Sequence, residues 1–259
     1  MTELLNGFVR GISAGLDART PYNANHSRDM AEYCAAFLDY EERTDGPYAM
    51  DENGRQELLM SVWLHDIGKL ATPIDVMDKS QRLTEKHFEK MTGRYHRREL
   101  MIRRGTLKDE ERKIMQDHVV YTSRMLRALN FPKNFRHVAS WAATHHEFLD
   151  GSGYPNHLTA ESLSWPARLI TILDIFEALT AADRPYRDSM NVSRALQILE
   201  KMVSEGKLDG SILKEYEKSE AWKNADNAEN AVKMRESRAG SHGNSFCCLC
   251  DGFVKVPFI

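Results

Sequence analysis

The sequence lacks the features of a disulfide-stabilised or membrane-spanning protein. It contains four cysteines, three of them crowded between residues 247 and 250, which is not the spacing of a disulfide framework. No apolar run is long enough to cross a bilayer without charges. The N-terminus lacks the basic and then apolar segments of a signal peptide. These absences predict a cytoplasmic protein without a membrane anchor.

A strong charge of either sign is also missing. The formal net charge of the 259 residues is −3, so no basic field favours non-specific binding of a nucleic-acid polymer. Local clusters of Lys and Arg could still hold a small phosphate ligand. The chain is long enough to bury a sizeable core in one domain and to carry an appendage.

The alternating pattern of apolar and polar residues that is typical of strands is absent as well. Apolar residues recur instead at helical spacing, which predicts an all-α fold, a single helical domain with its functional site in the bundle core. The expected helices include residues 26–45, 51–67, 84–104, 106–129 and 191–202. A strongly apolar helix is expected to begin at Trp165, with Pro166 in its first turn, where proline is tolerated.

The helix expected from residue 106 has one apolar face, and His118 lies on it. Its other inward members are expected to be Ile114, Met115, Tyr121, Thr122, Met125 and Leu129.

The composition changes near residue 218, which predicts a helical domain over residues 1–218 and a polar, flexible tail over 219–259. Within the tail, Cys247 and Cys250 have the spacing of a zinc-ligand pair. His242 and Cys248 are the only nearby candidates for the other two ligands, so the four-ligand requirement of a structural zinc site is poorly met.

The stretch His65-Asp66-Ile67-Gly68-Lys69 follows an apolar helix, and Gly68 is expected to end that helix. His65 and Asp66 therefore enter the core, where a buried charge needs a partner. Taken alone, the pair is better explained by a buried histidine that is hydrogen-bonded to its neighbour.

Further histidines and one aspartate are expected to face the same interior. An adjacent pair, His145 and His146, is hard to explain by packing, and a carboxylate at Asp174 within so apolar a helix is costly without a cation. The full inward set consists of His26, His65, Asp66, His118, His145, His146 and Asp174.

These donors are nitrogen and oxygen with no thiolate, which suits two divalent ions, Fe or Mn first, with Ni or Zn as alternatives. Two metals that share a carboxylate and a hydroxide are suited to cleaving phosphate esters.

Four segments together resemble the HD-GYP branch of the HD phosphohydrolase superfamily. They are HDIGK at 65–69, HHEFLDGSGYP at 145–155, DIFEALT at 174–180 and RPY at 184–186. The resemblance extends over about residues 20–215. It implies an all-α metal enzyme of bacterial signalling that hydrolyses cyclic di-GMP to pGpG or GMP. Some family members prefer related cyclic dinucleotides, and others only bind the nucleotide and signal.

The resemblance also implies roles for individual residues. Asp66 would bridge two metals, and Lys69 would neutralise the scissile phosphate. Gly153 and Tyr154 would form a lip over the substrate, which also contacts a signalling partner protein in this family. The terminal metal ligands would be His26, His65, His118, His145, His146 and Asp174, and the phosphate or a guanine edge would be held by Arg184 and Arg187, whose planar guanidinium groups suit it.

Two departures from the family pattern bear on this prediction. Residues 80–104 form an insertion between Lys69 and His118. Some family members bind a third metal through a glutamate four residues before the first histidine, and here that residue is Tyr22, a poor ligand because its phenol is normally neutral. Two metals per chain are therefore expected.

Two rival functions remain open at this point. One is a non-catalytic receptor that binds a cyclic dinucleotide and signals through residues 80–104 or the tail. The other is an HD hydrolase of a different nucleotide, which the Gly-Tyr-Pro motif argues against. A second copy of the chain, in a homodimer, also remains open as a partner.

Overall fold

The computed structural model describes residues 2–19, 25–77, 107–181 and 190–223. Every regular element in these segments is a helix, and no strand occurs among them, so the all-α prediction is confirmed. Tyr22, the insertion 80–104, Arg184, Arg187 and all but the first five residues of the tail 219–259 lie outside the described residues.

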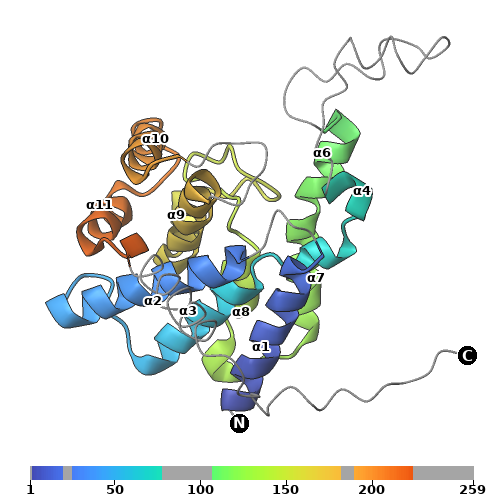
Figure 1. Ribbon diagram of the computed structural model, residues 1–259, viewed down its shortest axis with the longest axis horizontal. Coiled ribbons are helices and arrows are strands. Elements are labelled where there is room, and N and C mark those ends of the chain that lie inside the picture. Colours follow the sequence, from blue (N-terminus) through green and yellow to red (C-terminus); the bar gives the residue numbers. More distant parts are fainter. Residues whose placement is uncertain (1, 20–24, 78–106, 182–189, 224–259) are drawn as a thin grey trace, which may run out of the picture.

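The first part of the chain forms two long helices, a third that leads to the histidine–aspartate pair, and two short turns (Figure 1). As predicted, one helix begins at His26 and stops before Asp45, which has a left-handed backbone. The elements are α1 (Thr2–Asp17), α2 (His26–Thr44), α3 (Glu52–Leu64), the 3-10 helix η1 (Ile67–Ala71) and α4 (Ile74–Met77).

The second part adds the helices that complete the bundle. They are α6 (Asp109–Gln116), α7 (His118–Ala128), η2 (Lys133–Phe135), α8 (Val138–Ala142), η3 (Ala160–Ser162), α9 (Trp165–Thr180), α10 (Val192–Ser204) and α11 (Gly210–Ser219). In Figure 1, α10 and α11 lie on one side of α9, and α6 and α7 lie on the opposite side of the molecule.

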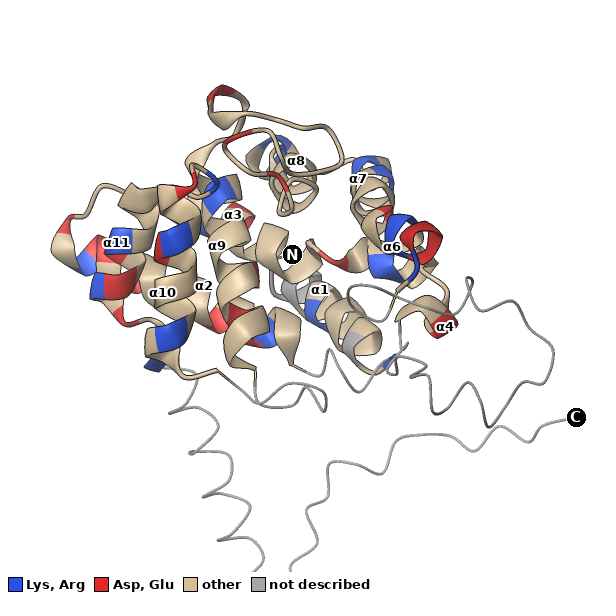
Figure 2. Ribbon diagram, turned by 90° about the horizontal axis from the view of Figure 1, so that it is seen from above, with Lys and Arg blue, Asp and Glu red and all other residues tan. Residues whose placement is uncertain are grey.

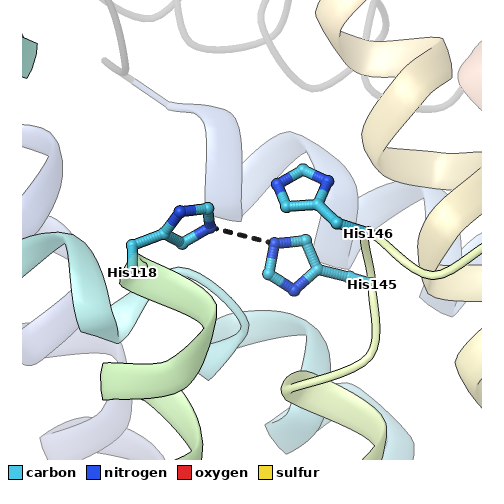
Figure 3. A group of neighbouring side chains, drawn as sticks. All are labelled: His118, His145 and His146. Carbon is cyan, nitrogen blue, oxygen red and sulfur yellow. Dashed lines mark hydrogen bonds between the residues drawn. The ribbon is translucent and has the colours of Figure 1, made fainter. Parts of the chain in front are cut away.

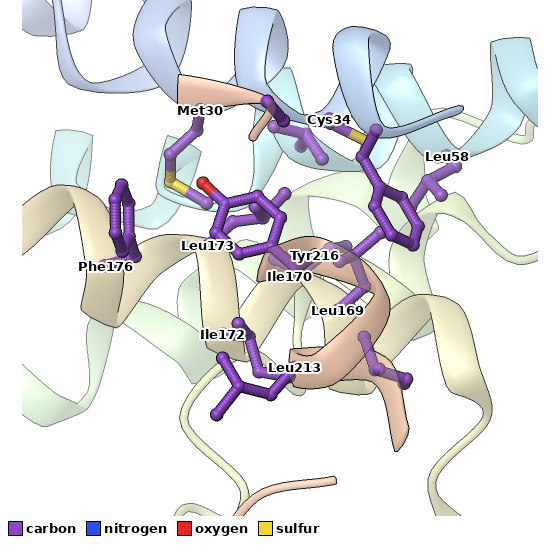
Figure 4. Close-up of a cluster of buried hydrophobic side chains, with 14 of the residues drawn as sticks. Met30, Cys34, Leu58, Leu169, Ile170, Ile172, Leu173, Phe176, Leu213 and Tyr216 are labelled. Carbon is purple, nitrogen blue, oxygen red and sulfur yellow. The ribbon is translucent and has the colours of Figure 1, made fainter. Parts of the chain in front are cut away.

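Two apolar clusters hold the bundle together, and α3 contributes to both of them. The larger joins α2, α3, α9, α10 and α11 around residues such as Phe37, Leu173 and Tyr216 (Figure 4). The smaller joins α1, α3, α7 and α8 around Leu64 and Leu126. Each fully buried side chain of this kind contributes about 1.5–3 kcal/mol. Because α3 is fixed on both sides, the residues that follow its last turn have a defined position.

The prediction that one helix spans residues 51–67 is wrong at its C-terminal end. The helix stops at Leu64, and Gly68 lies inside η1 rather than ending α3. A Cβ at Gly68 would lie 1.9 Å from the backbone oxygen of His118 and 2.5 Å from the backbone nitrogen of Thr122. The glycine is therefore required by the close approach of η1 to α7.

The prediction of one continuous helix over residues 106–129 is also wrong. The chain forms α6 and α7 with a break at Asp117, so the helical phase changes before His118. Three residues expected to face inward are exposed as a result, namely Ile114 at 40%, Tyr121 at 36% and Leu129 at 52%.

The surface carries both signs of charge on the outer sides of α6, α7, α10 and α11 (Figure 2). This mixture agrees with the small net charge of the sequence. Among the described residues, no helix has the length and apolar character needed to cross a membrane.

Candidate metal centre

Two groups of side chains with metal-binding atoms meet in the interior of the bundle. One consists of His26, His65 and Asp66, and the other of His118, His145 and His146. Within each group the candidate ligand atoms lie within 4.8 Å of one another. They come from the start of α2, the end of α3, the start of α7 and the segment after α8.

Three of the histidines are oriented in the same way by the backbone. In each, Nδ1 is hydrogen-bonded to the carbonyl oxygen of the residue three positions earlier. These bonds join His65 to Val62 at 2.7 Å, His118 to Met115 at 2.6 Å and His145 to Ala142 at 2.7 Å. Since a carbonyl can only accept, Nδ1 carries the proton and each Nε2 presents a lone pair to the interior.

The lone pairs of neighbouring rings face one another. Nε2 of His118 lies 3.3 Å from Nε2 of His145, and the ring of His146 lies beside them (Figure 3). In the other group, Nε2 of His26 lies 3.1 Å from Nε2 of His65. Two facing lone pairs repel unless a cation or a proton lies between them.

Asp66 lies between the two groups and turns one oxygen toward each. Its Oδ2 is 3.3 Å from Nε2 of His65 and 3.6 Å from Nε2 of His26. Its Oδ1 is 3.2 Å from Nε2 of His118 and 3.7 Å from Nε2 of His145. The side chain is 2% exposed, so this carboxylate can join two cations that water does not screen.

Asp174 of α9 also reaches both groups. Its Oδ1 is 3.5 Å from Nε2 of His26, and its Oδ2 is 3.7 Å from Nδ1 of His146. The sequence interpretation made Asp174 a terminal ligand. Its geometry is that of a second carboxylate between the groups.

The donor set fits divalent metal ions. Oδ1 of Asp66 is buried and has no hydrogen-bond partner among the described residues. Two ligand atoms that bind one ion at about 2.1 Å lie roughly 3 Å apart in neighbouring positions, close to the 3.1 and 3.3 Å between the facing Nε2 atoms. A divalent ion in each group would satisfy these lone pairs.

The electrostatics keep the ligands in the forms that bind metal. Burial, with the charge of His118, lowers the pKa of His146 to about 3. Burial, with the charges of His146 and His65, also holds the pKa of His145 well below its usual value. Burial alone would raise the pKa of Asp66, but the positive charge of Lys69 holds it well below normal. His145 and His146 are therefore neutral, and the carboxylate of Asp66 is ionised, near neutral pH.

Lys69 lies beside this centre. Its ammonium group donates a hydrogen bond to Oδ2 of Asp66. Arg19, which follows α1, donates to the backbone oxygen of Lys69 at 2.9 Å and so holds η1 in place. The predicted phosphate-binding lysine is thus at the metal centre, with 18% of its side chain exposed.

The loop with the Gly-Tyr-Pro motif packs on the second group. The ring of Tyr154 lies 4.8 Å from that of His146, and the backbone N–H of Tyr154 donates a hydrogen bond to the backbone oxygen of His146 at 3.1 Å. Gly153 is buried, and a Cβ there would lie 2.5 Å or less from backbone atoms of residues 146–148. The close packing of this loop is what requires the glycine.

Two buried glutamates at the site were not identified from the sequence. Glu147 accepts backbone N–H groups from Asn156 and Leu158, at 2.7 and 3.0 Å, and so closes the loop. Glu177 is hydrogen-bonded to Nδ1 of His26. Its position three residues after Asp174 puts both carboxylates on one face of α9, and this spacing was the available signal.

The structure brings together the seven residues predicted as metal ligands, along with Lys69 and Tyr154. Arg184 and Arg187 themselves lie outside the described residues, so the structure does not test their predicted contacts. The roles of all these residues remain predictions.

Comparison with known proteins places this geometry in a family context. The HD domain family model matches residues 96–212. The 3'3'-cGAMP-specific phosphodiesterase 3 of Vibrio cholerae serotype O1 is 34% identical over 76% of this chain and 35% of its own length. The 3'3'-cGAMP-specific phosphodiesterase 1 of the same organism is 31% identical over 76% of this chain and 38% of its own length.

A cyclic di-GMP phosphodiesterase of V. cholerae is 29% identical over 66% of this chain and 29% of its own length. The chain therefore spans about a third of the length of these relatives.

Proposed function

The chain belongs to the HD domain family, in its HD-GYP branch, and from this premise we propose that it is a metal-dependent phosphodiesterase acting on a cyclic dinucleotide. The observation that carries the proposal is the position of Asp66, which offers one carboxylate oxygen to each of two ligand groups. A pair of divalent ions supplies an activated water and screens the charge of a phosphodiester. A single structural metal would not need a carboxylate shared in this way.

The chain's own residues would then orient the scissile phosphate. Lys69 supplies a cation beside Asp66 that can neutralise a phosphate oxygen as charge develops during cleavage. Tyr154, whose ring packs at a tilt against that of His146, would form part of the lip over the substrate. Arg184 and Arg187 would bind a phosphate or a guanine edge.

For the substrate we propose cyclic di-GMP first and 3'3'-cGAMP as the alternative within the same class. Relatives of this chain are named for one or the other. Both are rings closed by two phosphodiesters, so the metals and Lys69 would serve either, and selection between them would depend on contacts to one base. Cleavage of one bond of cyclic di-GMP gives pGpG, and further cleavage gives GMP.

The metals proposed are two ions of Fe or Mn, with Ni or Zn as alternatives, because the ligands are imidazole and carboxylate. A signalling protein that contacts the Gly-Tyr-Pro loop and a second copy of the chain are the protein partners proposed.

The test is an assay of the purified protein loaded with Fe(II) or Mn(II). Each cyclic dinucleotide is incubated separately, and the linear products are separated by chromatography. Turnover of a cyclic dinucleotide to a linear product is expected, together with loss of turnover and a lower metal content in Asp66→Asn, because an amide cannot bridge two cations as a carboxylate does. Full metal occupancy and near-normal turnover in this variant would refute the two-metal proposal.

The receptor alternative gives a different result in the same experiment. A receptor would bind the nucleotide, as measured by calorimetry, without forming product under any metal. The complete set of donors in the described site favours an enzyme, because a receptor has no need of a shared buried carboxylate.

A further inference from the structure

His26 differs from His65, His118 and His145 in what its Nδ1 contacts. The rings of His65, His118 and His145 donate to neutral backbone carbonyls. The Nδ1 of His26 is instead hydrogen-bonded to the carboxylate of Glu177, and both side chains are 4% exposed. A negative charge therefore lies behind one candidate ligand of the first group.

Helix α9 supplies this charge from its last turns. Asp174 lies 3.5 Å from Nε2 of His26, and Glu177, three residues later, contacts the opposite nitrogen of the same ring. The imidazole at the start of α2 is thus held between two carboxylates of one helix. A carboxylate behind the ring of a histidine fixes the orientation of that ring and its tautomer.

Among the residues that the structure describes, no carboxylate is hydrogen-bonded to the remote nitrogen of His118 or His145, and these nitrogens contact backbone carbonyls instead. The three imidazoles of the second group share Oδ1 of Asp66 and, through His146, Oδ2 of Asp174. The first group has the other oxygen of each of these aspartates and, in addition, Glu177. Lys69 is hydrogen-bonded to the Asp66 oxygen that faces the first group, so the difference between the groups lies in Glu177 acting through the ring of His26 and not in a larger net negative charge.

We propose that Glu177 is a positioning residue that makes the His26–His65–Asp66 group the higher-affinity of two metal positions, so that this group fills first. A carboxylate on the remote nitrogen of a ligating histidine fixes the ring and increases the basicity of the ligating nitrogen. Losing such a partner typically weakens metal affinity about 10–100-fold. The inference rests on the two-metal reading of the proposed function.

The test is a titration of chelator-stripped protein with Mn(II) by equilibrium dialysis. Wild type is expected to bind two ions in two resolved steps. In Glu177→Gln, which keeps the shape of the side chain, the tighter step should weaken about 10–100-fold while the weaker step is unchanged. His26→Gln should weaken the same step as Glu177→Gln.

The chain offers a matched control in Glu57. This buried glutamate also contacts Nδ1 of a histidine, His137 at 3.1 Å, but that histidine belongs to neither ligand group. Glu57→Gln removes the same carboxylate–imidazole contact away from the metal centre, and both binding steps should stay as in wild type. Circular dichroism checks that each variant is folded, and Glu177→Asp, which retains the charge, replaces Glu177→Gln if the latter fails to fold. If Glu177→Asp is used, the proposal is supported when its tighter binding step is weakened less than that of His26→Gln. The proposal is opposed when the two variants weaken this step equally.

The outcomes separate this inference from the function it rests on. A tighter step that is unchanged in folded Glu177→Gln overturns the inference and leaves the two-metal proposal intact. The same holds if His118→Gln, and not His26→Gln, removes the tighter step. A wild-type protein that binds one ion at saturation instead refutes the two-metal reading itself.

Discussion

The hydroxyl of Thr122 on α7 donates a hydrogen bond to the backbone oxygen of His65 at 2.9 Å. The Thr122 hydroxyl oxygen also accepts a hydrogen bond from the backbone N–H of Gly68 at 3.0 Å, and the Thr122 side chain is fully buried. One side chain thus satisfies a backbone acceptor and a backbone donor of the turn that carries His65 and Asp66. The site depends on this contact because α3 has already ended at Leu64.

Thr122→Val should therefore destabilise the fold and lower the metal content. Valine has nearly the same shape, but it leaves two buried backbone groups unpaired, which costs about 1–3 kcal/mol. Urea unfolding measures the stability, and metal analysis measures the occupancy. Thr171→Val is the matched control, since this buried hydroxyl contacts only the carbonyl of Ala167 one turn earlier in its own helix. Equal losses in the two variants would contradict a special role for Thr122.

Gly68→Ala tests the close approach of η1 to α7. The added Cβ would meet backbone atoms of His118 and Thr122, which cannot rotate away. Overpacking of this kind typically costs about 1–3 kcal/mol, so the melting temperature should fall, and the displaced histidine should weaken metal binding. Gly15→Ala in α1 meets nothing within 4 Å and should be neutral or stabilising. A normal melting temperature in Gly68→Ala would show that the two elements separate easily.

The gathering of the seven candidate ligands in the interior could be predicted from the sequence because each lies in a local motif or on a helix face expected to point inward. Helices such as α9 could be predicted for the same reason, since Pro166 and the long apolar run identify its start. The break at Asp117 could not, because residues 106–129 have helical spacing throughout, and the packing of α7 on η1 joins segments far apart in the sequence. Glu177 was missed because its partner, His26, lies 151 positions away.

Lys69→Ala should separate phosphate binding from metal binding. The Lys69 ammonium contacts Asp66 but lies in neither ligand group, so both metals should remain bound. Removing a positioned cation at a reacting phosphate typically slows turnover by about 10²-fold or more. Steady-state kinetics with the cyclic dinucleotide and metal analysis of the same sample provide the measurement. Loss of metal along with activity would show that Lys69 has a structural role.

The number of metals per chain should be two under saturating Fe or Mn. A third ion would need an anionic ligand four residues before His26, and the sequence has Tyr22 at that position, whose phenol is normally neutral. Helix α2 begins at His26 itself, and Asn25 has a left-handed backbone with φ of 73°. Because no turn of α2 precedes His26, Tyr22→Glu should leave the count at two, although it supplies a carboxylate. Metal analysis that gives three ions per chain in wild type, with anomalous scattering from an ion beside Tyr22, would contradict the prediction.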